Sequence, residues 1–185
     1  MKKTVSLFGF ATVLLWACSA LAAPAHAAPV ATISPQLAAL AKAEHGRAVL
    51  LLDVRSHAEA AFAGQATPAD ALVPFAEAAQ PLRWDSASGS VAVVRVPDFV
   101  EWARAWVAFY GGDEDTPLLL LCRTGAVAAA AAEVLHQAGF THVTVIQGGL
   151  DGAGSEDGPQ YAGWKAAGLP WLAQADPVFL FGETD

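Results

Sequence analysis

The sequence predicts an α/β fold in which a central parallel sheet of about five strands carries helices on both faces. Short apolar runs alternate with helical patterns, as expected of parallel strands joined by crossover helices. The clearest run is Leu118–Leu121, four consecutive leucines typical of a strand buried on both faces. It ends at Cys122, and an alanine-rich helical pattern follows as far as His136, with Gly139 closing it. This order places Cys122 at the sheet edge where open α/β folds bind ligands.

The first half of the chain shows the alternation. A helix is predicted over 34–46, because a serine that can cap it is followed by a proline at its first position. The apolar run 48–52 predicts a second buried strand. A short helix is predicted over 56–64, from a capping serine to a terminating glycine, and a short strand over 70–74.

The middle of the chain is less regular. Residues 75–89 contain Pro81 and a tip rich in serine and glycine, which predicts an irregular, partly exposed insertion. Residues 91–96 predict an extra strand at the sheet edge. A helix is predicted from Pro97, and the spacing of its large side chains favours a stripe facing the core over a docking face. The stripe consists of Phe99, Trp102, Ala103, Trp106, Phe109 and Tyr110.

The remaining segments complete the domain. Residues 111–115 form an acidic turn that lacks the ligand spacing of a calcium loop. Residues 141–146 predict another buried strand, and the glycine-rich residues 151–158 predict a flexible surface loop. A last short helix is predicted over 159–167.

The N-terminal residues have the outline of a secretory signal peptide. Two lysines precede an apolar run, and an Ala-His-Ala sequence ending at Ala27 matches the cleavage pattern. We therefore expect a signal peptide over 1–27, one domain over 28–172 without a membrane span, and a C-terminal tail over 173–185. The expected location is the periplasm. An uncleaved membrane anchor and lipidation at Cys18 are the alternatives.

Charge and cysteine content exclude several classes of function. The formal net charge is −8, and loss of residues 1–27 would leave eight basic against 18 acidic residues, a charge of −10. Such a chain is unsuited to the phosphate backbone, so no nucleic acid partner is expected. Of two cysteines only Cys122 would remain, which excludes an internal disulfide and a zinc site of cysteines and histidines. The sequence predicts no metal site and no cofactor.

The position of Cys122 favours a reactive thiolate. The first N–H groups of a helix have no partner within it, and the helix dipole adds positive potential there, so anionic sulfur is stabilised. Arg123 adds a positive charge, and Gly125 allows the loop to turn its N–H groups inward. The alternative is a buried cysteine that only packs, but packing does not require an anion cradle.

Four short motifs occur in an order and spacing shared with one family. They are Asp53-Val54-Arg55, Ala71-Leu72-Val73-Pro74, Cys122-Arg123-Thr124-Gly125, and Gly148-Gly149-Leu150 followed by the segment 163–170. Each motif is weak alone, but the ordered set is specific. Over roughly residues 34–171, the chain resembles the rhodanese (thiosulfate sulfurtransferase-like) family.

The resemblance implies a single rhodanese-like domain with sulfurtransferase activity. Cys122 would take a sulfane sulfur from a thiosulfate-like donor, a small sulfur-containing anion, and pass it from a persulfide to a thiol or cyanide. Asp53 and Arg55 are expected to be structural, with Arg55 paired to a carboxylate such as Glu59. Loop N–H groups would bind the substrate. The implied substrate-binding residues are Arg123, Thr124, Gly125, Ala126 and Val127.

Two observations qualify this interpretation. Many bacterial members end the active loop with an arginine where this chain has Val127, which leaves weaker donor binding or a donor other than thiosulfate as alternatives. A cysteine phosphatase loop would need an arginine where Ala128 stands. The alternative function is a non-catalytic exported module that binds a partner protein or a sulfur species. It is motivated by Val127, by the insertion over 75–90 and by the face carrying Trp102 and Trp106.

Overall fold

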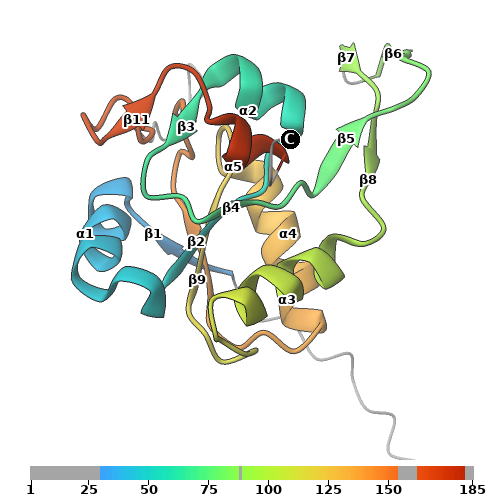
Figure 1. Ribbon diagram of the computed structural model, residues 1–185. Coiled ribbons are helices and arrows are strands. Elements are labelled where there is room, and N and C mark those ends of the chain that lie inside the picture. The colour runs from blue at the N-terminus through green and yellow to red at the C-terminus, as the bar shows by residue number, and fades with distance from the viewer. Residues whose placement is uncertain (1–29, 88, 154–161, 182–185) are drawn as a thin grey trace, which may run out of the picture.

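A computed structural model of the chain has a central sheet of five strands. It describes residues 30–87, 89–153 and 162–181. The strands are Ala31–Ile33 (β1), Leu50–Asp53 (β2), Ala71–Leu72 (β4), Leu118–Leu121 (β9) and Val143–Ile146 (β10). Their order is β1-β10-β9-β2-β4, and every pairing is parallel (Figure 1). The predicted α/β class and parallel sheet are confirmed, whereas the predicted signal peptide lies outside the described residues.

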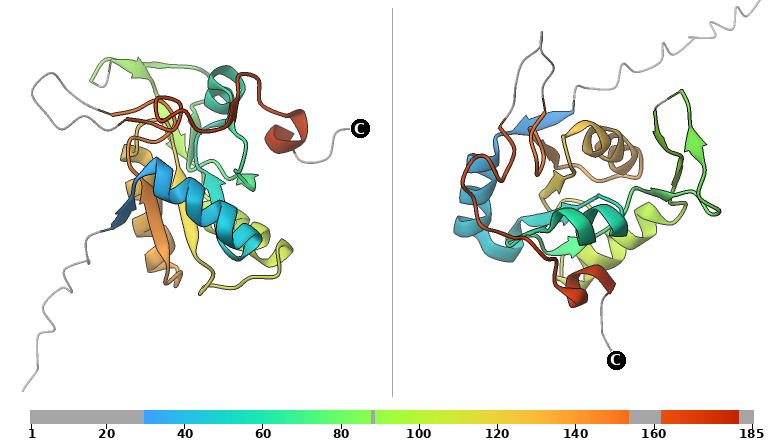
Figure 2. Two further views of the ribbon diagram at one scale, coloured as in Figure 1. Left: turned by 90° about the vertical axis from the view of Figure 1, so that its left-hand side faces the viewer. Right: turned by 90° about the horizontal axis from the view of Figure 1, so that it is seen from above.

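Helices cover both faces of this sheet, as predicted. They are Pro35–His45 (α1), with the 3-10 turn Gly46–Ala48 (η1), His57–Ala63 (α2), Phe99–Phe109 (α3), Ala126–Gln137 (α4) and Pro177–Phe181 (α5). One face packs against α3 and α4, where Phe99 and Leu135 are buried. The other packs against α1 through Ala38, and Figure 2 shows α1 and α4 on opposite sides. Among the described helices, none is long and apolar enough to cross a membrane.

Capping side chains fix where the first two helices begin. Ser34 Oγ accepts a hydrogen bond from the N–H of Leu37 at 3.3 Å, and Pro35 occupies the first position of α1. At α2, Ser56 and Glu59 form a reciprocal capping box. Each bond satisfies an N–H group that has no acceptor within its helix, so both helices start where the sequence predicts.

The aromatic stripe on α3 is only partly buried, so the prediction of a core-facing stripe is wrong for two of its rings. Trp102 is 42% exposed and Phe109 is 74% exposed. The buried positions of α3 are Phe99, Ala103 and Val107. Because these positions are four residues apart, they form one narrow face, and the neighbouring rings turn toward solvent.

The predicted edge strand over 91–96 does not join the central sheet. It belongs to an antiparallel arm that projects from the body (Figure 1). The arm consists of Ala76–Ala78 (β5), Trp84–Asp85 (β6), Ser90–Val91 (β7) and Val93–Arg95 (β8). In it β5 pairs with β8 and β6 with β7, so the insertion over 75–89 is more regular than predicted. The fifth strand of the sheet is β1, whose three residues are too few to show a pattern.

The C-terminal segment packs on the domain. Strand Gln65–Ala66 (β3) pairs antiparallel with Trp171–Leu172 (β11), a pairing that the sequence did not predict. The described part of the predicted helix over 159–167 forms turns instead. Buried Trp164 explains this, because its Nε1 donates to the carbonyl of Pro170 at 2.9 Å and folds the chain back.

Candidate active site

Cys122 lies directly after β9, in the loop that leads into α4. The residue is 1% exposed. The sulfur accepts two peptide hydrogen bonds, from the N–H of Gly125 at 3.1 Å and from the N–H of Ala128 at 3.3 Å. Gly125 has a φ of +100°, a left-handed conformation that glycine adopts without strain, and this loop conformation places its N–H toward the sulfur. The sulfur is therefore buried but faces peptide donors.

These donors allow the sulfur to carry a negative charge. Burial alone disfavours an ion, because the ion loses its hydration. Here two N–H groups replace part of that hydration, and the N-terminus of α4 adds the positive potential of its dipole. The arrangement can stabilise a thiolate, and it can stabilise an anionic sulfur bonded to Cys122.

The segment that follows β10, which includes Gly148 and Gly149, is hydrogen-bonded to the loop that carries Cys122. The N–H of Leu150 donates to the carbonyl of Cys122 at 2.8 Å, and the N–H of Asp151 donates to the carbonyl of Arg123 at 3.0 Å. Gly149 has a φ of +57°, and a Cβ there would lie 2.3 Å from the Cys122 carbonyl oxygen. Position 149 therefore accepts only glycine, because any side chain would displace the loop.

Arg123 is held at the surface by an acidic residue. Its side chain is 66% exposed, and its Nε lies 3.3 Å from Oδ2 of Asp151. The other carboxylate oxygen of Asp151 accepts a hydrogen bond from Lys165 Nζ at 2.8 Å. Burial raises the pKa of Asp151, but the hydrogen bonds and charges of Lys165 and Arg123 outweigh it and hold this pKa below its ordinary value. The only cation of the loop is thus already paired.

Asp53 and Arg55 form a buried ion pair beside the site. Arg55 Nε donates to both carboxylate oxygens of Asp53, at 2.9 and 3.0 Å, and Nη2 donates to the carbonyl of Gly64 at 2.7 Å. The expectation that Arg55 pairs with a carboxylate is confirmed, but the carboxylate is that of Asp53 and not that of Glu59, which caps α2 at Ser56. Burial raises the pKa of Asp53. Burial by itself would lower the pKa of Arg55. The hydrogen bonds and the charge of Asp53 outweigh this effect, so the pKa of the guanidinium is raised.

The predicted substrate-binding residues lie around the sulfur in different ways. Only Gly125 among them donates a hydrogen bond to Sγ. Thr124, Ala126 and Val127 are exposed along the loop and the first turn of α4. The second donor, Ala128, was missed, although the third residue of a helix is a position whose N–H is free to bind an anion. Asp151 was also missed. The sequence contained a signal for Asp151, because this residue follows β10, and β10 lies beside β9, the strand that ends at Cys122.

A family comparison agrees with this geometry. The sequence-family model of the rhodanese-like domain matches residues 36–156 of this chain. The chain belongs to the rhodanese-like family. No curated protein matched the sequence.

Solved structures of rhodanese-like folds resemble this one. Rv0390 from M. tuberculosis has a TM-score of 0.52 and 25% identity, and the match covers 79% of this chain and 99% of that one. The rhodanese-like domain of a protein from Anabaena sp. has a TM-score of 0.50 and 20% identity, covering 79% of this chain and 80% of that one. The second likeness concerns the fold alone.

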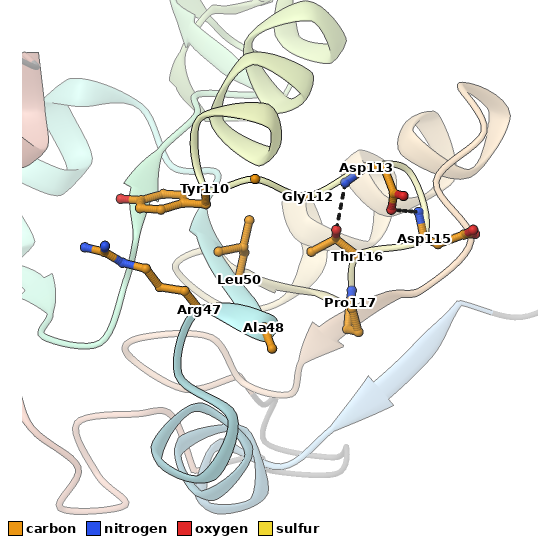
Figure 3. A pocket seen from close by; sticks show the side chains of 10 residues that line it. Arg47, Ala48, Leu50, Tyr110, Gly112, Asp113, Asp115, Thr116 and Pro117 are labelled. Atoms are coloured by element: carbon orange, nitrogen blue, oxygen red, sulfur yellow. Dashed lines mark hydrogen bonds between the residues drawn. The ribbon is translucent and has the colours of Figure 1, made fainter.

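Two cavities of this rhodanese-like domain differ in what lines them. A cavity of about 330 Å³ adjoins the active loop and is lined by Arg55, Arg123, Asp151 and Lys165, among others. A cavity of about 440 Å³ lies at the opposite end of β2 and β9, near Arg47 and Tyr110 (Figure 3). Its lining contains neither cysteine nor histidine. Among the described residues, no group of three or more histidine, cysteine, aspartate or glutamate side chains could hold a metal ion.

Proposed function

We propose that the chain is a sulfurtransferase that carries a sulfane sulfur as a persulfide on Cys122. The observation that carries this proposal is the pair of N–H groups aimed at Sγ from Gly125 and Ala128, at the N-terminus of α4. A cysteine that only packs gains nothing from such donors. The donor would be a small compound that carries a sulfane sulfur, and the acceptor a thiol or cyanide.

The chemistry requires only the thiolate and its surroundings. The Cys122 thiolate attacks the outer sulfur of the donor, a sulfur–sulfur bond forms, and the donor's own sulfur–sulfur bond breaks. With thiosulfate, sulfite leaves with the bonding electron pair. The peptide N–H groups then stabilise the negative charge of the persulfide, as an oxyanion hole does. An acceptor nucleophile attacks the outer sulfur and regenerates the thiolate.

Intact mass spectrometry tests this function directly. Incubation with saturating thiosulfate should add about 32 Da, one sulfur, to the wild-type chain. The variant Cys122→Ser should gain no mass, and subsequent cyanide should remove the added sulfur from the wild type. A wild-type chain that gains no mass from any sulfane-sulfur donor would contradict the proposal.

Export is a separate proposal that rests on the sequence of residues 1–27. We propose that a signal peptidase removes this segment after Ala27 and that the mature protein resides in the periplasm. Cell fractionation followed by intact mass measurement should find a chain that starts at Ala28. A full-length chain in the membrane would favour the anchor, and an acylated Cys18 would favour lipidation.

A non-catalytic binding module is the second candidate function. Two observations favour it: exposed aromatic rings on α3, Trp102 and Phe109, and the arm formed by residues 76–95. Steady-state turnover of cyanide with several sulfane-sulfur donors, thiosulfate and an organic persulfide among them, separates the two functions. Turnover that is lost in Cys122→Ser supports the enzyme, and absence of turnover with every donor in both forms supports the module.

A further inference from the structure

The charges around Cys122 indicate which class of sulfur donor the site accepts. Five charged side chains line the cavity beside the active loop: Arg55, Glu59, Arg123, Asp151 and Lys165. Arg55 is neutralised by Asp53, and Asp151 contacts both Arg123 and Lys165. With Asp53 included, the described residues of these surroundings carry three cations and three carboxylates, so their formal charges sum to zero. Among the described residues, every side-chain cation of this lining therefore contacts a carboxylate, although Nη1 of Arg55 is buried without a hydrogen-bond partner.

The sulfur itself has a neutral environment. Its two hydrogen-bond donors are uncharged peptide N–H groups. Cys122 also belongs to the buried apolar cluster that includes Val54, Val73 and Phe99. Because the residue is 1% exposed, a donor must shed water before its outer sulfur reaches Sγ. Losing hydration costs most for multiply charged groups.

Two donor classes differ in the charge that they bring. Attack on thiosulfate joins a thiolate to a dianion, so three negative charges meet, and sulfite leaves as a dianion. Attack on a neutral hydropersulfide, R–S–SH, brings a single negative charge. The Cys122 sulfur bonds to the outer SH sulfur, the S–S bond of the donor breaks, and R–S⁻ leaves with the electron pair. The proton stays on the outer sulfur, so Cys122 becomes a neutral hydropersulfide. The total charge of the reacting groups remains −1 throughout.

We propose that the sulfur donor of this site is a hydropersulfide, and that Asp151 makes the site unfavourable for dianionic donors such as thiosulfate. The inference rests on the proposed function of Cys122 as the sulfur carrier. Asp151 acts by holding the guanidinium of Arg123 at 3.3 Å and by placing a negative charge beside the loop. The formal charge of the whole chain, −8, also repels a dianion during its approach.

The test compares the rates at which two donors load Cys122. Freshly prepared 2-hydroxyethyl hydropersulfide, whose organic part is uncharged, is compared with thiosulfate, and the mass gain is followed after quenching with iodoacetamide. Hydropersulfides are intrinsically reactive, so the ratio of the two rates is divided by the same ratio for free N-acetylcysteine. We expect the enzyme to increase this ratio about tenfold or more.

Ionic strength and one charge substitution add independent readouts. Added salt should accelerate loading from thiosulfate, because it screens repulsion, and should leave loading from the hydropersulfide unchanged. Asp151→Asn should raise the thiosulfate rate severalfold and change the hydropersulfide rate less than about twofold. The matched control is Glu101→Gln, which removes the same charge from an exposed position on α3 and should change neither rate.

The possible results separate a failure of the donor assignment from a failure of the proposed function. A normalised ratio at or below one, or no response of thiosulfate loading to salt and to Asp151→Asn, overturns the donor assignment while the sulfurtransferase function stands. If neither donor loads Cys122, the proposed function fails, and the donor assignment fails with it.

Discussion

The sulfur of Cys122 accepts hydrogen bonds from two backbone N–H groups, those of Gly125 and Ala128, so the conformation of single residues controls this site. Gly149 shows this most clearly. In Gly149→Ala the new Cβ would meet the Cys122 carbonyl oxygen at 2.3 Å, and the φ of +57° would be strained. We expect a loss of about 2 kcal/mol or more in the free energy of unfolding, with slower loading of Cys122.

Chemical denaturation and persulfide mass measurement check this expectation. The matched control is Gly168→Ala, because Gly168 has a φ of +68° but nothing within 4 Å of its Cβ position. It should cost only about 1 kcal/mol and leave loading unchanged. Equal losses in both variants would show that φ alone, and not the close approach to Cys122, restricts position 149.

The ion pairs of Asp151 predict a pH dependence of stability. Its folded-state pKa lies below the ordinary value, because the hydrogen bonds and charges of Lys165 and Arg123 outweigh its burial. A lowered pKa contributes stability that is complete above the unfolded value of about 3.9 and is lost as pH falls through the folded value. Thermal melts should show a Tm deficit of Asp151→Asn at pH 6 that shrinks below about pH 4. A deficit that stays constant across this range would contradict the assignment.

At the scale of elements, the Asp53–Arg55 pair joins the end of β2 to the end of α2. Arg55 reaches both the carboxylate of Asp53 and the carbonyl of Gly64, and it is 1% exposed. Arg55→Met leaves the buried carboxylate of Asp53 with only the backbone N–H of residue 55 as a donor and with no compensating charge, and should cost about 3–5 kcal/mol. Urea denaturation measures this, and the double variant Asp53→Leu, Arg55→Met should recover most of the loss.

An exposed ion pair serves as the control for the buried Asp53–Arg55 pair. Arg104 and Glu114 are 43% and 49% exposed, so Arg104→Met should cost less than about 1 kcal/mol. If the double variant at Asp53 and Arg55 were as unstable as Arg55→Met alone, the loss would come from packing and not from an uncompensated charge.

Helix α5 is a second element with a separate energetic role. Leu180 is 8% exposed and packs with Ala60, Leu72 and Ala175 in a small cluster apart from the main core. Leu180→Ala should lower the free energy of unfolding by about 2 kcal/mol, while the rate of Cys122 loading stays the same. Val178→Ala is the control, because Val178 is 56% exposed and should be nearly neutral. A change in loading would instead show that α5 supports the active loop.

At the scale of the whole molecule, the parallel sheet determines which groups meet. The carboxyl ends of β2, β9 and β10 lie at one sheet edge, which brings Asp53, Cys122 and Asp151 to the same region although they are far apart in the sequence. The order of apolar runs was sufficient to predict this edge and the place of Cys122 on it. The strand over 91–96 shows the limit: its conformation was predicted, but its pairing with β5 depends on a distant segment.

The sequence by itself determined the alternation of strands and helices, the capped helix starts, and a cysteine placed between a buried strand and a helix. These follow from local rules of periodicity, capping and glycine conformation. Only the tertiary structure decided that Ala128 is the second donor to Sγ, that Asp53 is the partner of Arg55, and that Asp151 holds Arg123. The reason is that hydrogen bonds and ion pairs depend on distances between atoms, and for residues 123 and 151 only folding sets those distances.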